Sequence, residues 1–194
     1  MKTSLLVALC LPFVLSFCLR AYGDPEACCP QCLCPEYVLI NKHETFEERL
    51  YKSSRWITTD LPDTSRGSVM GGFWKLNEYI KNFEVSGRPV ILSVRTGENG
   101  QEQVTLSYHI SPDTVLPNFN DQTIKEEIRP GGTVYVRIFS SDQSEKMIKE
   151  NKDMLFKDLQ AAGILFDDTR YDAAAYKGIF VLEDRQDEIW SHAF

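Results

Sequence analysis

The chain has 194 residues, of which 28 are Asp or Glu and 21 are Lys or Arg, so its formal net charge is −7 at pH 7. An acidic surface of this kind repels nucleic acid and anionic membranes, and no basic stripe offsets it. The length, together with 11 Phe, 8 Tyr and 3 Trp, is sufficient for the core of one domain or of two small fused halves.

The first 23 residues have the features of a secretory signal peptide. Lys2 supplies the positive charge at the start, and the apolar run from Ser4 to Cys18 is shorter than the roughly 20 residues that span a bilayer. Ala21-Tyr22-Gly23 places small residues where a signal peptidase cleaves. We therefore expect residues 1–23 to be removed and the chain to be secreted, with no membrane span. An uncleaved signal anchor is the alternative.

Residues 24–35 form a predicted N-terminal arm that holds Cys28, Cys29, Cys32 and Cys34. In an oxidising compartment disulfides are expected. Adjacent Cα atoms lie about 3.8 Å apart, too close for an ordinary disulfide, so two pairings remain open. These are Cys28–Cys32 with Cys29–Cys34, or Cys28–Cys34 with Cys29–Cys32. Bridges between chains would instead give a disulfide-linked oligomer, and a thiolate metal cage is the less favoured alternative.

The first half of the remaining chain, residues 36–194, combines extended segments with one helix. Residues 45–59 read as extended. Apolar side chains at helical spacing predict a helix over 67–83, and a buried strand is expected over 89–94. After a turn, the alternation of apolar and polar residues over 104–110 predicts a half-buried strand.

The second half repeats this scheme. A weak strand pattern at 123–129 precedes a strong one at 133–139, and a helix is predicted over 143–162. Closing strands are expected at 175–182 and 188–190. Because neither half covers both faces of its own sheet, we predict one α+β domain. It would be a distorted, mostly antiparallel β-barrel made from two βαββ-type halves and flanked by two helices.

Five short motifs, in this order and spacing, resemble the SOUL heme-binding protein family from about Tyr37 to Trp190. They are FEERLY at 46–51 with Trp56, GFWKLNEYI at 72–80, RPV at 88–90, TVYVRIFSS at 133–141, and the ending formed by Tyr171, AAY at 174–176 and DEIW at 187–190. The resemblance implies a barrel with two outer helices, which agrees with the repeat described above.

The resemblance also implies non-enzymatic binding of heme or protoporphyrin in an apolar groove on the first helix. Met70, Phe73, Trp74 and Asn77 are the ligand-binding residues that it suggests. One branch of the family carries a proposed histidine ligand to iron at a position where this chain has Leu50. A second branch binds without that histidine but has a lysine where this chain has Glu78.

Two functions follow as alternatives. The first is a secreted carrier or scavenger of tetrapyrroles, and the second is an extracellular interaction module that has lost the ligand. We find no nucleophile elbow, phosphate loop or HExxH, so no catalytic residues are assigned and no enzyme is expected. His43, His109 and His192 are too widely spread to predict a metal site.

Overall fold

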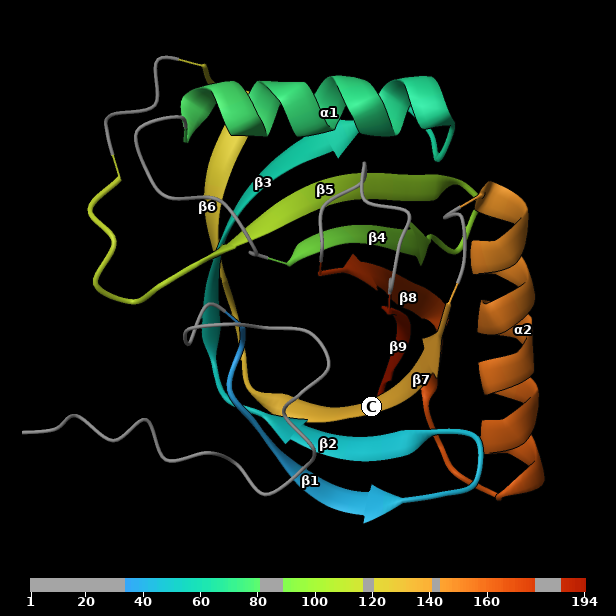
Figure 1. Cartoon of the computed structure of the whole chain (residues 1–194). Helices are drawn as coiled ribbons and strands as arrows, with labels where there is room; N and C mark the ends of the chain where they lie inside the picture. The colour runs from blue at the N-terminus through green and yellow to red at the C-terminus, as the bar shows by residue number, and fades with distance from the viewer. Residues whose placement is uncertain (1–33, 81–88, 117–120, 141–143, 177–185) are drawn as a thin grey trace, which may run out of the picture.

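The computed structural model describes residues 34–80, 89–116, 121–140, 144–176 and 186–194. This part of the chain forms one curved antiparallel sheet with two helices on its outer side (Figure 1). The strands are β1 (Tyr37–Lys42), β2 (Glu47–Tyr51), β3 (Ser54–Leu61), β4 (Val90–Thr96), β5 (Glu102–Ile110), β6 (Ile124–Arg129), β7 (Gly132–Phe139), β8 (Asp167–Ala175) and β9 (Asp187–His192). The helices are α1 (Arg66–Tyr79) and α2 (Glu145–Ala161).

The strand order shows the two related halves. The sheet runs β1-β2-β7-β9-β8-β4-β5-β3-β6. In the unit β3-α1-β4-β5 the last strand lies between the other two, and the unit β7-α2-β8-β9 has the same arrangement. The units meet where β4 pairs with β8. The predicted α+β class and βαββ halves are thus confirmed, although the barrel is a strongly curved sheet that does not close.

The helices divide the molecule into an outer and an inner core. α1 packs on β3 and β5, while α2 packs on β7, β8 and β9. Apolar residues that face the helices form one cluster under each helix, whereas Trp56, Ile91 and Trp190 belong to a third cluster on the inner face. Within the described ranges, no helix is long and apolar enough to cross a membrane.

Both helices begin at a serine cap. The hydroxyl oxygens of Ser65 and Ser144 accept hydrogen bonds from backbone N–H groups in the first turns of α1 and α2, which would otherwise be unsatisfied. Gly163, at φ +68°, ends α2 in the left-handed region that favours glycine. The observed helices lie inside the predicted ranges 67–83 and 143–162 apart from one residue at the start of α1. Of those ranges, residues 81–83 and 143 fall outside the described part.

Two strands differ from the sequence prediction. A strand was expected at 175–182, but the observed strand β8 begins earlier, at Asp167, and ends at Ala175. Residues 177–182 lie outside the described part. The start of β8, Asp167 to Arg170, is polar and either half-buried or exposed, so it has no apolar alternation to detect. β1 was not predicted, because it is an edge strand whose apolar Val38 and Ile40 point to solvent.

α1 lies close to the sheet at Gly72. A Cβ atom there would come within 2.5 Å of Leu61 Cδ2 and 3.3 Å of Leu106 Cδ2. We expect Gly72→Ala to lower the free energy of unfolding by about 1–3 kcal/mol, because the added methyl group overpacks this contact. Gly71→Ala is the matched control, since its Cβ would meet nothing within 4 Å.

For Gly71→Ala the gain in helix propensity should raise stability by up to about 1 kcal/mol. Urea unfolding of both variants measures the difference. Equal effects at the two positions would contradict the close approach of α1 to the sheet.

Candidate functional site

A cavity of about 500 Å³ lies between the two helices and the outer face of the sheet. We call it the interhelical cavity. Its volume is within the range of about 300–1,000 Å³ that is usual for small-molecule sites. Its apolar walls come from both halves of the fold: Val69 and Met70 on α1, Ile148 on α2, Phe139 on β7, and Val90, Leu92, Leu106 and Ala173 on the sheet. The cavity therefore lies at the junction of the two βαββ units.

The polar end of this cavity is formed by the first turns of α1 and α2. Thr64 and Arg66 line it from one helix, and Ser144 and Glu145 line it from the other. A helix N-terminus carries a partial positive charge, and Arg66 adds a full one. Glu145 opposes them, but its carboxylate accepts hydrogen bonds from Lys149 at 2.8 Å and Thr64 at 3.0 Å. These bonds hold the pKa of Glu145 below its usual value. Asp187 and Glu188 line the cavity as well, and Glu188 is paired with Arg49 at 2.9 Å. The first turns of the helices, with Arg66, are therefore the part of the cavity that suits an acidic group of an otherwise apolar ligand.

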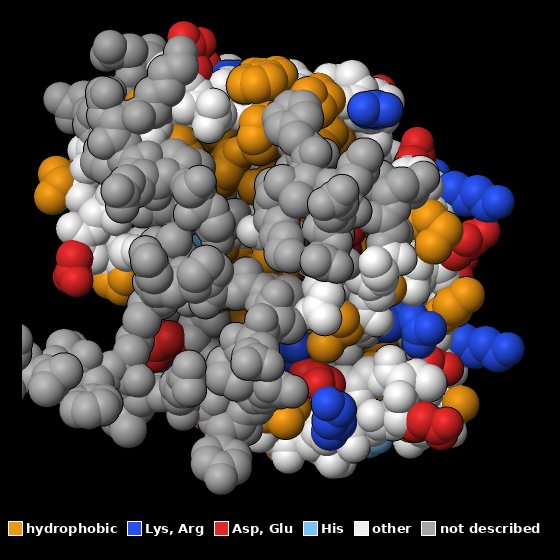
Figure 2. All heavy atoms as spheres, viewed as in Figure 1, with side chains coloured by type: hydrophobic (Ala, Val, Ile, Leu, Met, Phe, Trp, Pro, Cys, Tyr) orange, Lys and Arg blue, Asp and Glu red, His pale blue; other side chains and the backbone are white. Residues whose placement is uncertain are grey.

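In Figure 2, hydrophobic side chains gather along α1 and on the part of the sheet beneath it. Ala173, Ala174 and Ala175 of β8 line the interhelical cavity, and their small side chains leave its volume unfilled. A larger residue at these positions would occupy the space that a ligand needs.

The structure brings one of the four predicted ligand residues into the cavity wall, namely Met70. Phe73 is only 9% exposed and packs beneath α1, with its ring centroid 5.8 Å from that of Tyr108. Trp74 is 54% exposed, and its ring meets the Phe73 ring edge-on at 5.4 Å. Asn77 is half-buried on α1 and does not line the cavity.

The sequence analysis missed the contribution of α2 to the cavity wall. Ile148 faces the cavity from this second helix. Ile148 belongs to the apolar face of the helix predicted over 143–162. Periodicity could identify that face but could not show that it lies opposite Met70.

The two departures from the family pattern lie away from the cavity. Leu50 is 45% exposed on β2 and pairs with Val38 and Thr133 on the neighbouring strands. β2 contributes no residue to the cavity, so a side chain at position 50 does not reach it. Glu78 is exposed on α1, and it too is absent from the cavity wall.

The three histidines also lie elsewhere. His43 stacks on Phe46 with ring centroids 4.1 Å apart, His109 is buried with its ring 5.1 Å from Trp56, and His192 Nε2 lies 2.9 Å from Asp172 Oδ2. No group of three or more His, Cys, Asp or Glu in the described ranges is arranged to hold a metal ion. Among the described residues that line the interhelical cavity, the Met70 thioether is the only soft donor available to iron.

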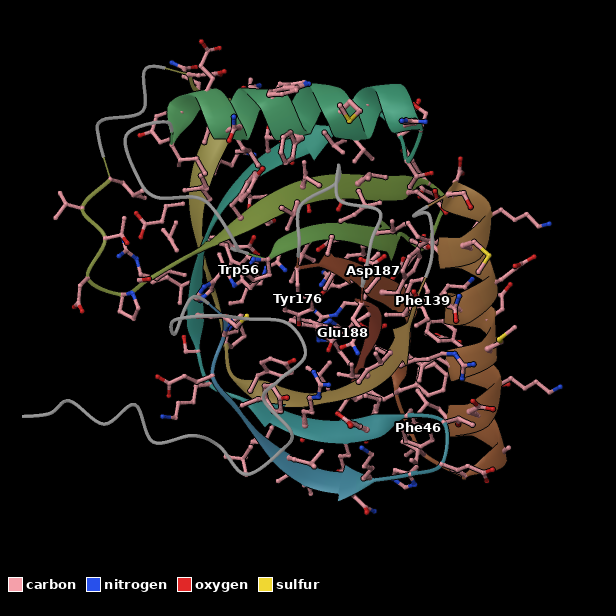
Figure 3. The ribbon with its side chains drawn as sticks, viewed as in Figure 1. Phe46, Trp56, Phe139, Tyr176, Asp187 and Glu188 are labelled. Atoms are coloured by element: carbon pink, nitrogen blue, oxygen red, sulfur yellow. The ribbon has the colours of Figure 1, made fainter. Side chains whose placement is uncertain are left out.

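A buried ionic network lies on the inner side of the sheet, around Glu188 of β9. Its Oε1 accepts a hydrogen bond from Arg49 Nη1 at 2.9 Å. Its Oε2 accepts from Tyr176 Oη at 2.6 Å and from Trp190 Nε1 at 2.7 Å. Arg49 Nη1 also donates to Tyr51 Oη at 3.1 Å. Figure 3 shows Tyr176 and Glu188 close together inside the curved sheet.

Burial and this carboxylate set the protonation of the network. Burial raises the pKa of Tyr51 and of Tyr176, and the negative charge of Glu188 raises both further, so both phenols stay neutral. Burial lowers the pKa of Arg49, but the charge of Glu188 and the electrostatic contributions of the neighbouring tyrosines together raise it by more, so the net pKa rises. Arg49 also donates to Glu47 Oε2, from Nη2 at 2.7 Å and from Nε at 2.9 Å. The network is thus an arginine held between two carboxylates, with neutral donors around Glu188.

The motifs at the two ends of the chain meet in this network. Arg49 and Tyr51 come from the FEERLY motif, whereas Tyr176, Glu188 and Trp190 come from the AAY and DEIW motifs. The two groups of residues are more than a hundred positions apart in the sequence, and their contacts connect β2 with β9 and with the end of β8. The motifs at the chain ends therefore hold the strands together, and the C-terminal motifs also contribute Ala174, Ala175, Asp187 and Glu188 to the lining of the interhelical cavity.

Of the four cysteines in the predicted arm, Cys34 is the one within the described part of the chain. It is half-buried and packs with Tyr37 against the inner core cluster. Cys28, Cys29 and Cys32, and with them the two alternative pairings, lie outside the described residues. The signal peptide over 1–23 lies outside them as well.

A curved antiparallel sheet of two βαββ units, with an apolar cavity between its helices, defines a ligand-binding fold. The chain belongs to the SOUL heme-binding protein family, whose sequence model matches residues 32–192. It is 29% identical to heme-binding protein 2 of Mus musculus, over 75% of this chain and 77% of that protein. Heme binding is therefore the function of the family.

Solved structures share the fold at low sequence identity. The C-terminal domain of EcmrR superposes with a TM-score of 0.56 at 11% identity, covering 76% of this chain and 95% of that domain. A hydrolase from Listeria innocua superposes with a TM-score of 0.50 at 10% identity, covering 80% of this chain and 94% of that chain. At these identities the likeness concerns the fold alone.

Proposed function

We propose that this protein binds heme or a related tetrapyrrole in the interhelical cavity, as a secreted carrier or scavenger, without catalysing a reaction. The observation that carries the proposal is an apolar cavity of about 500 Å³ with Arg66 and two helix N-termini at one end. A porphyrin is a flat apolar ring with carboxylates along one edge, so it matches both parts. Membership of a heme-binding family supports the same ligand class.

The described walls fit the ring itself better than they fit its iron. Met70 offers a thioether, but no histidine or cysteine of the described chain lines the cavity. Binding would come mainly from burial of the apolar ring, at about 25 cal/mol per Å². Heme supplies a redox-active iron when bound, whereas the residues of this cavity hold the ring and its carboxylates.

This leads to a test that compares heme with the metal-free ring. Hemin and protoporphyrin IX should bind with dissociation constants within about threefold of each other, in the micromolar range. Titration followed by Soret absorbance and Trp quenching measures both constants. Arg66→Gln should weaken both ligands by about three- to tenfold, because it removes a partly exposed charge from the ring carboxylates.

Two outcomes would count against the proposal. If neither ligand binds below about 100 μM, which corresponds to only about 5.5 kcal/mol, the carrier function is excluded. If hemin binds far more tightly than protoporphyrin IX, iron ligation contributes, and Met70→Leu then shows whether the thioether is the ligand.

The alternative is an extracellular interaction module, and one observation favours it. The edge strand β1 carries Val38 and Ile40, which are 52% and 53% exposed, and Leu50 of β2 pairs directly with Val38. This apolar edge directly follows the cysteine-rich arm of residues 24–35. In this alternative, Cys34 would form a disulfide with another cysteine of that arm, within one chain or between two. The titration above separates the two functions, since a module that has lost its ligand binds neither ring.

A further inference from the structure

A second cavity, of about 630 Å³, opens on the inner face of the curved sheet. We call it the inner cavity. It shares no lining residue with the interhelical cavity. Its walls include Trp56 on β3, Ser93 and Arg95 on β4, Arg170 on β8 and Trp190 on β9. The two cavities lie on opposite faces of the same sheet.

The charge of the inner cavity is opposite to that of the whole protein. The described residues that line it include more basic than acidic side chains: Lys52, Arg95, Arg129 and Arg170 against Glu127 and Asp172. In the chain as a whole, acidic residues outnumber basic ones by 28 to 21. A positive cavity in an acidic protein concentrates anions locally.

The two acids already have partners within the cavity wall. Asp172 Oδ2 lies 2.9 Å from His192 Nε2 and 3.9 Å from Arg129 Nη1. Burial raises the pKa of Asp172, but these two neighbours lower it further than burial raises it, so the carboxylate stays charged. Glu127 Oε2 accepts a hydrogen bond from Thr58 at 3.0 Å and lies 3.5 Å from Arg129 Nε. Arg129 is thus the cation that the two acids neutralise.

Because Glu127 and Asp172 pair with Arg129, Arg95 and Arg170 form a pair of like charges that these two acids do not neutralise. They are direct partners in the β4–β8 ladder, and both side chains line the inner cavity. Like charges directly opposite each other on neighbouring strands are destabilising. Within the described ranges, Asp167 is the carboxylate at ion-pairing distance from them, 3.8 Å from Arg170 Nε. Arg170 Nε is buried and has no hydrogen-bond partner among the described residues.

We propose that the inner cavity binds a small, multiply charged oxyanion between Arg95 and Arg170. Each guanidinium presents a planar fork of donors that matches two oxygens of a phosphate or carboxylate group. An anion with two or more charges would neutralise both arginines and satisfy the Nε donor of Arg170. The site is separate from the tetrapyrrole cavity and does not depend on it.

Isothermal titration calorimetry with pyrophosphate and with citrate, at low ionic strength, tests this site. We expect at least one of the two anions to bind, and the change in Trp56 and Trp190 fluorescence to follow the same saturation curve. Arg95→Gln and Arg170→Gln should each weaken that binding about tenfold, because each removes one charge-assisted interaction. Lys125→Gln on β6 is the control, because Lys125 pairs with Asp60 at 3.0 Å outside both cavities.

Thermal unfolding shows that the variants are folded. Without added anion, Arg95→Gln should unfold at or above the melting temperature of the parent, since it relieves the repulsion. Protoporphyrin IX affinity should be unchanged in both variants. The proposal is overturned if neither anion binds the parent protein, or if both variants bind pyrophosphate and citrate as well as the parent does. Preference for one anion identifies the ligand as a phosphate or as a carboxylate.

Discussion

Arg49→Ala should lower the free energy of unfolding by about 3–5 kcal/mol, the largest effect that we expect from any single substitution in this protein. The Arg49 side chain is 4% exposed and that of Glu188 is 5% exposed. Removing the guanidinium leaves a carboxylate buried without its counter-ion, and the two neutral donors that remain, Tyr176 and Trp190, do not replace the charge.

Urea unfolding measures this loss, and Lys42→Ala is the matched control. Lys42 Nζ lies 3.5 Å from Glu47 Oε1, but its side chain is 70% exposed. Its removal should cost less than about 1 kcal/mol. The double variant Arg49→Met/Glu188→Gln should be more stable than Arg49→Ala, since it leaves no charge at position 188, and Glu47, which loses Arg49 in both variants, keeps Lys42 as a partner. A loss below about 1.5 kcal/mol for Arg49→Ala would show that the network is not a buried ion pair.

Met70→Glu should weaken hemin and protoporphyrin IX binding by about 30- to 100-fold. The substitution places a carboxylate in the apolar wall of the interhelical cavity, where it loses hydration when the ring binds, at a cost of about 2–3 kcal/mol. The control is Trp74→Glu, one helical turn further along α1. Trp74 is 54% exposed and does not line the cavity, so binding should change less than about threefold.

Comparing Met70→Glu with Trp74→Glu distinguishes a ligand in the interhelical cavity from a ligand on the outer face of α1. Fluorescence quenching and Soret titration of both variants give the affinities, and far-UV circular dichroism confirms that the helix is intact. If Trp74→Glu abolishes binding and Met70→Glu does not, the ligand lies on the outer face of α1, as an aromatic surface there would suggest. The interhelical cavity would then be excluded as the tetrapyrrole site.

Helical spacing on α1 could not separate a ligand-binding residue from a core residue. Met70, Phe73, Trp74 and Asn77 lie within one or two turns of each other, so one periodic pattern includes them all. Their surroundings are set by β3 and β5, on which α1 packs, and by the cavity that Ile148 of α2 also lines. Phe73 is buried against Tyr108, whereas Met70 faces the cavity, and only the tertiary structure distinguishes them.

The arrangement of the strands was predictable for a different reason. Alternation over 104–110 and the strong pattern at 133–139 correspond to β5 and β7, which are buried on at least one face. β1 and the start of β8 escaped prediction because their exposed positions follow no such pattern. The inner cavity also escaped, since Arg95 and Arg170 are 75 positions apart in sequence and become neighbours only through the β4–β8 ladder.

The position of β9 has a consequence for how the chain reaches this structure. β9 is the last strand along the chain, yet it is hydrogen-bonded between β7 and β8 in the interior of the sheet. Neither neighbour can complete its ladder until residues 187–192 have left the ribosome. During synthesis the edges of β7 and β8 that face β9 have unpaired backbone groups, and loop closure over such separations is slow. The growing chain therefore depends on its final strand, and chaperones would have their longest opportunity to bind just before it appears.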